Sequence, residues 1–230
     1  MKIHRDIKQG SEEWNSIRRG KLTASNADKI LTPGGKLSKS ADGYMMSLIA
    51  ECFATPDYEK WAGNRFTDWG NAWEPVARQA FMRHLRFTGH CHSHLSMEEV
   101  GFCVMDSGVV GCSPDGLLFD GSHLVAGVEI KCPTIESHGQ YVMEGVLPDK
   151  YKPQVHFSMI VTGLPCWHFF SFFPGLMPLH VLVEQDDYTD KLTSAVVEFA
   201  EKYAQLWPVG TAKLQQTEDY RKAMDGITGG

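Results

Sequence analysis

The segment from Val100 to Lys131 constrains the fold of this chain more than any other. It is rich in β-branched and aromatic residues punctuated by glycine, and Asp120-Gly121 is placed as a tight turn between two such runs. This pattern predicts a β-hairpin, and runs of similar texture elsewhere predict further strands. The expected strands lie near residues 100–105, 108–113, 116–119, 124–131, 166–173 and 178–184.

Helical patterns occur before, between and after these strands. Ser11 is placed as the cap of a short helix that ends at Gly20, and Ser25 with Asp28 has the spacing of a capping box for a second helix reaching about Leu31. Apolar residues at helical spacing predict further helices near residues 44–53, 67–87, 151–162 and 188–207. This order predicts an α/β (α+β) fold with a central mixed β-sheet flanked by helices.

Composition indicates one globular domain. Of the 230 residues, 43% are hydrophobic and 22% are charged, which excludes a disordered, collagen-like or coiled-coil chain. We expect a single domain over residues 1–210 and a loosely held C-terminal tail over residues 211–230, after Pro208. No apolar run reaches the roughly 18 residues of a membrane span, so the prediction is a cytoplasmic protein without a membrane partner. The six cysteines form no CxxC pair, which is typical of reduced thiols.

The charge is unevenly distributed along the chain. The formal net charge is −6, but residues 1–40 hold nine basic and four acidic residues, which leaves +5 in this segment and −11 in the remainder. A net negative charge argues against a nucleic-acid partner unless the basic surface is local. The basic N-terminal segment is the place where such a local surface is expected.

The residues best suited to chemistry lie at the two ends of the predicted hairpin. Ser113-Pro114-Asp115-Gly116 precedes it, and Glu129-Ile130-Lys131 follows 14 positions after Asp115. Glu129 and Lys131 point to the same side of one strand, and the hairpin brings Asp115 back beside them. Carboxylate oxygens suit Mg²⁺, and a nearby lysine suits phosphodiester hydrolysis. Alone, the Ser113–Gly116 motif is more often a turn, and Glu129 with Lys131 is more often the exposed face of an edge strand. Their joint occurrence at hairpin spacing favours a catalytic site.

These motifs resemble a known family. Ser113-Pro114-Asp115, Glu129-Ile130-Lys131-Cys132-Pro133, Gly70–Glu74 and Tyr151–Gln154 are together similar to the lambda exonuclease, or YqaJ-like viral recombinase, family of the PD-(D/E)xK nuclease superfamily. The resemblance covers roughly residues 9–185 and implies a PD-(D/E)xK nuclease-like fold. It implies a Mg²⁺-dependent exonuclease that digests one strand of linear double-stranded DNA from the 5′ end. The 3′ overhangs would serve recombination with a single-strand annealing protein, and similar enzymes form ring-shaped homotrimers.

The resemblance also implies roles for individual residues. Lys131 would serve the nucleophilic water, with Gln154 beside the site, and two Mg²⁺ ions would bind per active site, with Mn²⁺ as a substitute. The implied metal ligands are Asp115, Glu129, the main-chain carbonyl of Ile130, and Glu74. A helical projection places Glu74 at the margin of an apolar stripe, where an ordinary glutamate is also common.

A pocket for a terminal 5′-phosphate is implied near the N-terminus. Its implied members are Arg18, Ser25 and Ser113, with Arg19 as a neighbouring charge, and a guanidinium fork suits phosphate oxygens. The alternative is that Arg18 is a solvated charge at a helix end.

The chain departs from the family a few residues after Lys131-Cys132-Pro133. The family has an arginine there, whereas this chain has Thr134–His138, with Ser137 in the arginine's place. His138, Arg19 or Lys21 are candidate substitutes, so a strict requirement for a 5′-phosphate is not expected from the sequence alone.

Other interpretations remain open. A zinc site is one, because imidazole and thiolate side chains are close in sequence at His90, Cys91, His92 and His94, although a surface loop of this kind is more common. Phe169–Phe173 is either a base-stacking platform or, more commonly, a buried strand. The chain could also be a PD-(D/E)xK DNA endonuclease or a catalytically inactive DNA-binding relative.

Overall fold

A computed structural model describes residues 1–54, 65–89 and 94–228 of the chain. The strands are β1 (Lys2–His4), β2 (Leu22–Thr23), β3 (Leu95–Glu98), β4 (Phe102–Val104), β5 (Val110–Cys112), β6 (Gly116–Asp120), β7 (His123–Lys131), β8 (Cys166–Ser171) and β9 (Leu179–Glu184). The helices are α1 (Glu12–Arg18), α2 (Ala41–Glu51), α3 (Arg65–Phe87), α4 (Ile135–Glu144), α5 (Lys152–Thr162) and α6 (Asp187–Thr228), with 3₁₀ helices η1 (Ala24–Lys29) and η3 (Asp149–Tyr151).

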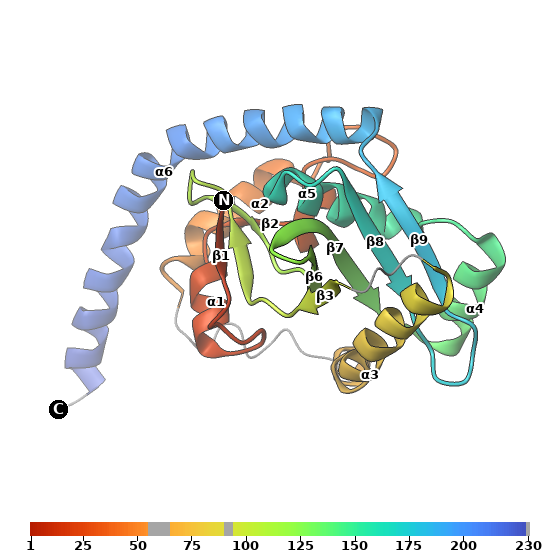
Figure 1. Cartoon of the computed structure of the whole chain (residues 1–230). Helices are drawn as coiled ribbons and strands as arrows, with labels where there is room; N and C mark the ends of the chain where they lie inside the picture. Colours follow the sequence, from red (N-terminus) through yellow and green to blue (C-terminus); the bar gives the residue numbers. More distant parts are fainter. Residues whose placement is uncertain (55–64, 90–93, 229–230) are drawn as a thin grey trace.

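The strands form two mixed sheets surrounded by helices (Figure 1). The five-stranded sheet has the order β3-β6-β7-β8-β9, in which only the β7–β8 pair is parallel. The chain between these two strands contains α4, η3 and α5, as expected for a helical crossover between parallel strands. The four-stranded sheet has the order β1-β4-β5-β2. The predicted architecture, a mixed sheet flanked by helices, is confirmed.

The predicted hairpin is formed by β6 and β7. Gly116 pairs with Val128 at its open end and Asp120 pairs with His123 at the turn, with one irregularity in the register between Leu118 and Phe119. Gly121 adopts a positive φ of 62° in the turn, which glycine accommodates readily. This register places Asp115 beside the end of β7.

Helices cover both faces of the five-stranded sheet. On one face, α3 packs through Phe81 against Val128, Ile130 and Phe170. The alternate residues of the same strands point to the other face, where α5 and α6 complete the larger core. There the ring of Trp167 lies against Gly127 so closely that a Cβ atom on residue 127 would be 2.3 Å from the ring. Glu129 points to this second face as well, toward α5.

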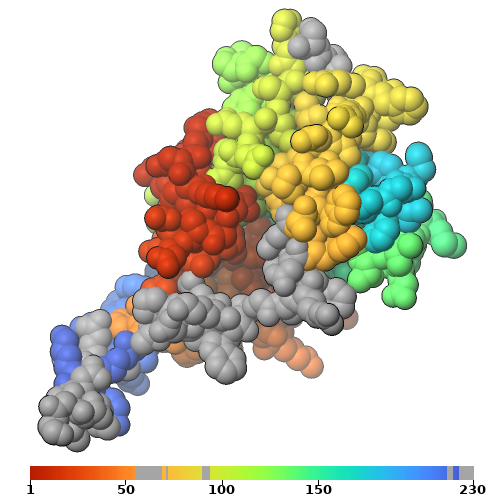
Figure 2. All heavy atoms as spheres, turned by 90° about the horizontal axis from the view of Figure 1, so that it is seen from below, coloured from red at the N-terminus to blue at the C-terminus, as the bar shows by residue number. Residues whose placement is uncertain are grey.

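Figure 2 shows the molecule from below, with the N-terminal segment in red and α3 in yellow on the same face. The C-terminal part of α6 projects beyond the body of the molecule in both views (Figures 1 and 2).

No helix in the described ranges is both long enough and apolar enough to cross a bilayer. The cysteines in those ranges are all free thiols, as predicted: Cys52, Cys103, Cys112, Cys132 and Cys166.

Two predicted helices differ from the structure. The second helix is the 3₁₀ helix η1, and Ser25 lies inside it instead of capping it. The residue before η1 is Thr23, whose hydroxyl accepts a hydrogen bond from Asn26 Nδ2 at 3.1 Å and lies 3.3 Å from the Ser25 hydroxyl, so that it caps no main-chain N–H. The capping-box prediction is therefore wrong.

The last helix is longer than predicted. It continues through Pro208 to Thr228, so the expected end near Trp207 is wrong. Proline removes one N–H from the helix ladder and bends helices without always ending them, and α6 is visibly bent (Figure 1). Beyond the proline, Gly210 lies against the side chain of Ile49, which holds this part of α6 to α2. The division of the chain at residue 210 stays a prediction.

Candidate active site

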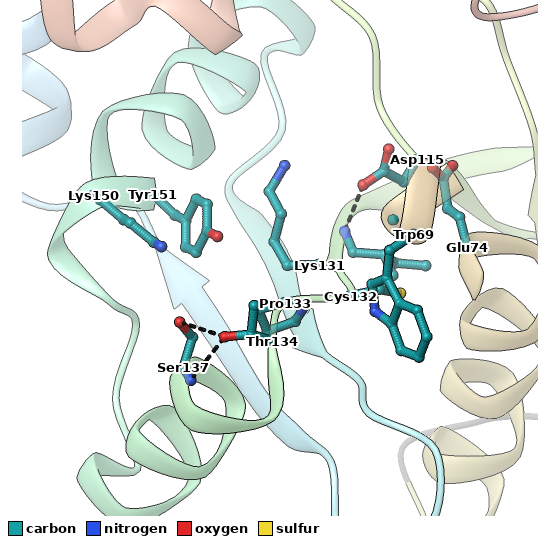
Figure 3. A pocket seen from close by; sticks show the side chains of 12 residues that line it. Trp69, Glu74, Asp115, Lys131, Cys132, Pro133, Thr134, Ser137, Lys150 and Tyr151 are labelled. Carbon is teal, nitrogen blue, oxygen red and sulfur yellow. Dashed lines mark hydrogen bonds between the residues drawn. The ribbon is translucent and has the colours of Figure 1, made fainter. Parts of the chain in front are cut away.

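Asp115 is fixed at the junction between β5 and β6. Its main-chain N–H donates to the Val128 carbonyl at 3.1 Å, which continues the β6–β7 ladder by one residue. Its carboxylate Oδ2 accepts a hydrogen bond from the Ile130 main-chain N–H at 2.6 Å (Figure 3). The hairpin thus brings Asp115 to the end of β7, as the sequence spacing predicted.

Glu129 and Lys131 point to the same side of β7 and form an ion pair. Lys131 Nζ lies 2.5 Å from Glu129 Oε1, and Gln154 on α5 donates to the same oxygen at 2.6 Å. The Glu129 side chain is only 2% exposed, so two donors hold it in a fixed position. Burial opposes the charge on Lys131, but the carboxylates of Glu129 and Asp115 together raise its pKa above the ordinary value.

Arg78 joins α3 to this hairpin and was not singled out from the sequence. Its guanidinium contacts the Glu74 carboxylate one turn earlier on α3 and the Glu99 carboxylate at 2.9 Å. Its Nε donates to the main-chain carbonyl of Asp115 at 2.8 Å. The i, i+4 spacing of Glu74 and Arg78 is a visible sequence signal for the first contact, whereas the contact with Asp115 depends on the tertiary fold.

Asp115, Glu74 and Lys131 border a cavity of about 370 Å³. Figure 3 shows Lys131 projecting between an acidic side with Asp115 and Glu74 and an opposite side with Tyr151 and Lys150. Thr134 and Ser137, at the start of α4, also line it. The full lining is Trp69, Gly70, Glu74, Asp115, Ile130, Lys131, Cys132, Pro133, Thr134, Ser137, Lys150 and Tyr151.

The acidic side has the donor chemistry of a Mg²⁺ site. Mg²⁺ binds one or two carboxylates and fills its remaining positions with water and phosphate oxygens, and this cavity offers Asp115 and Glu74. Burial and the charge of Glu129 raise the pKa of Asp115 to about 7, and burial together with the charge of Asp115 raises the pKa of Glu74. A cation would relieve this crowding of negative charge.

The predicted ligand set is only partly assembled. Glu129 is engaged with Lys131 and Gln154, and Glu74 is engaged with Arg78. Across the described ranges, no group of three or more His, Cys, Asp or Glu side chains is placed to hold a metal ion. Asp115 and Glu74 therefore offer two carboxylates to a metal, and the assignment of Asp115, Glu129, Ile130 and Glu74 as its ligands stays a prediction.

The structure connects the residues of the predicted phosphate pocket. Arg18 Nη2 donates to the Ser25 hydroxyl at 3.2 Å, and the Arg18 guanidinium lies 3.8 Å from the centre of the Trp14 ring. The Trp14 indole N–H in turn lies 2.9 Å from the Ser113 hydroxyl, two residues before Asp115. Trp14 thus links the two parts of the predicted pocket.

The three candidate substitutes for the family's arginine have different surroundings. His138 is fully buried, and its ring nitrogens contact the Ser171 hydroxyl at 2.8 Å and the Met177 carbonyl at 3.0 Å, so its suggested role is wrong. Arg19 follows the last residue of α1. Burial and the charge of Glu51 raise the pKa of the Cys52 thiol, and the charges of Lys21 and Arg19 offset part of this rise. A substitution of the family's arginine by Arg19 or Lys21 stays a prediction.

The two other segments with alternative interpretations are the histidine cluster and the phenylalanine-rich segment. His90, Cys91 and His92 lie outside the described residues, and the main-chain carbonyl of His94 accepts a hydrogen bond from Gly121. Phe169 and Phe170 are fully buried, which confirms that this segment of β8 is core.

The sheets, their helices and the acidic cavity define an α/β nuclease-like fold. The chain belongs to the YqaJ-like viral recombinase family, whose domain model matches residues 13–165. It is similar to two crystal structures of the alkaline exonuclease LHK-Exo from Laribacter hongkongensis. One, in complex with dAMP, has a TM-score of 0.69 at 25% identity over 90% of this chain and 100% of that one. The other has a TM-score of 0.64 at 26% identity over 89% and 100%.

A phage-related exonuclease from Haemophilus somnus 129PT shares the fold, with a TM-score of 0.52 at 16% identity over 81% of this chain and 94% of that one. No curated protein matches the chain.

Proposed function

We propose that the chain is a Mg²⁺-dependent 5′→3′ exonuclease of linear double-stranded DNA. It would leave 3′ single-stranded overhangs for phage-type recombination by single-strand annealing. The observation that carries the proposal is the convergence of Asp115, Glu74 and Lys131 on one cavity in a chain of the YqaJ-like family. The similarity to the alkaline exonuclease LHK-Exo supports the same reaction class.

The residues of the cavity divide the work of phosphodiester hydrolysis. Asp115 and Glu74 would hold the metal, which when bound supplies an activated water and neutralises charge on the leaving oxygen. Lys131 presents its ammonium group to the same space, where it would orient the nucleophilic water and stabilise negative charge on the phosphate. Glu129 would position Lys131 through their ion pair, and Gln154 would hold Glu129 in place by donating a hydrogen bond to the same carboxylate oxygen.

Strand polarity is tested with a linear duplex that carries a 5′-phosphate on one strand only. With each strand labelled at its 3′ end, we expect the phosphorylated strand to be shortened first, with mononucleotides released from its 5′ end in Mg²⁺. Shortening from 3′ ends would contradict the proposal. A covalently closed plasmid is the control, because an exonuclease leaves it intact whereas the alternative endonuclease cuts it.

Arg18 provides a test of the 5′-phosphate pocket. We expect Arg18→Ala to lower the ratio of rates on phosphorylated and hydroxyl 5′ ends by about tenfold, the value of a charge-assisted hydrogen bond. The matched control is Arg5→Ala, because Arg5 forms an exposed ion pair with Glu98 at 2.8 Å. An unchanged ratio in Arg18→Ala would remove Arg18 from the pocket.

The assembly and partners belong to the same proposal. A homotrimeric ring acting with a single-strand annealing protein in the cytoplasm of a bacterial host follows from the family resemblance. A ring that encloses DNA needs positive potential only along the DNA path, so a net charge of −6 is compatible with this substrate.

A further inference from the structure

The side of the cavity opposite Asp115 and Glu74 carries a cation to which the proposed reaction gives no role. Lys150 precedes Tyr151 in η3 and lines the same cavity as Lys131 (Figure 3). We propose that Lys150 forms a second phosphate subsite, a role that rests on the proposed function. It would bind a phosphate group of the DNA strand next to the phosphate under attack.

Two aromatic rings hold Lys150 in place. Its ammonium nitrogen lies 4.9 Å from the centre of the Tyr151 ring and 5.3 Å from that of Tyr141. A lysine side chain loses considerable rotamer entropy when it binds a ligand. The contacts with the two tyrosine rings already restrict Lys150, so less entropy is lost on binding. Burial works against its charge, but the hydroxyl groups of Tyr141 and Tyr151 raise the pKa of Lys150, so it stays charged at neutral pH.

Among the described residues, no carboxylate forms an ion pair with Lys150. Of the two lysines in the cavity, Lys131 is paired with Glu129, whereas no ion pair of Lys150 is found within the described part of the chain. Both ammonium groups lie beside the same ring, since Lys131 Nζ is 5.3 Å from the centre of Tyr151. Two like charges around one ring favour an anion between or beside them.

The neighbouring groups of the cavity suit a phosphate. Ser137 lies in the first turn of α4, where the helix dipole is positive, and lines the cavity together with Thr134. Thr134 accepts a hydrogen bond from the Ser137 N–H at 3.4 Å and lies 3.2 Å from its hydroxyl, so the turn is preformed. Lys150 adds a positive charge to this side of the cavity from η3.

The test compares Lys150→Gln with Lys152→Gln. Lys152 is the matched control, because it lies two residues later and also contacts an aromatic ring, that of Tyr188 at 4.6 Å, but does not line the cavity. DNA binding is measured in Mg²⁺ in an Asp115→Asn background, between 50 and 200 mM salt. Loss of one phosphate contact is expected to reduce the slope of log K against log salt by about 0.7 to 0.9 for Lys150→Gln, and to leave it unchanged for Lys152→Gln.

Kinetics with the native Asp115 provide a second readout. We expect Lys150→Gln to raise KM by about tenfold with kcat little changed, because the contact is made equally in the bound substrate and the transition state. Lys150→Arg keeps the charge and is expected to restore both KM and the salt slope. A fall in kcat at constant KM would overturn the subsite in favour of a role in the chemical step.

Two further outcomes separate this inference from the proposed function. If the wild-type protein does not hydrolyse linear DNA, the proposed function fails. If it does, and Lys150→Gln has a wild-type KM and salt slope, only the subsite fails. A deoxynucleoside 5′-monophosphate is tested as an inhibitor in the same series. If Lys150→Gln weakens this inhibition without changing the salt slope, Lys150 holds the released nucleotide, and the assignment to the strand is overturned.

Discussion

Asp115→Asn is expected to reduce hydrolysis of linear duplex DNA by at least about a thousandfold, because it removes the charge of a carboxylate that we propose binds the metal, and with it several kcal/mol of transition-state stabilisation. The amide oxygen of asparagine can still accept the hydrogen bond from the Ile130 N–H, so the hairpin is expected to keep its shape. The measurement is single-turnover release of nucleotides in Mg²⁺, with EDTA as the metal-free comparison.

Asp120→Asn is the matched control for this loss. Asp120 is the exposed last residue of β6, at the far end of the same hairpin, and its substitution is expected to leave turnover within about twofold of wild type. Turnover by Asp115→Asn at near the wild-type rate, or wild-type activity undiminished in EDTA, would contradict the proposed metal site.

Phe81→Ala is expected to lower the free energy of unfolding by about 3–5 kcal/mol, because a fully buried aromatic ring is replaced by a cavity. The ring makes an edge-on contact with Phe170, with centroids 5.3 Å apart, and this contact holds α3 against the sheet. Urea denaturation measures the change through the transition midpoint. Since α3 also carries Glu74 and Arg78, turnover is expected to fall together with stability.

The control for Phe81 lies on the same helix. Phe87 is 89% exposed at the end of α3, and Phe87→Ala is expected to change the free energy of unfolding by less than about 0.5 kcal/mol. Equal shifts of the urea midpoint in the two variants would show that α3 is not anchored through Phe81.

The sequence predicts the hairpin and its chemistry because both depend on local patterns. The Asp120-Gly121 turn and the alternation along β7 are sufficient to bring Asp115 to Glu129 and Lys131. Strands read from β-branched and aromatic runs agree with β4 to β9 within a few residues. The very short strands β1 and β2 carry too few residues for a periodic signal, and they form only because β4 and β5 offer them edges.

Other parts of the site depend on contacts that a linear pattern does not contain. Helix α4 escapes prediction although Thr134 caps it, because Gly139 and several polar residues weaken its helical pattern. Arg78 reaches the Asp115 carbonyl only after α3 has packed on the sheet, and Lys150 reaches the cavity only through the crossover from β7 to β8. At Pro208 the prediction is wrong in the opposite direction, because tertiary contacts stabilise the helix beyond a residue that usually ends one.

The position of Asp115 between the two sheets has a consequence for how the protein fails under stress. Residues 113–115 leave β5 in one sheet and enter β6 in the other, so slippage of the two sheets against each other is expected to displace this carboxylate. We then expect activity to be lost at a lower denaturant concentration than the one that exposes the buried Trp167 of the core. The fluorescence of this tryptophan reports the second event. A molecule with displaced sheets would therefore lose activity while it is still compact.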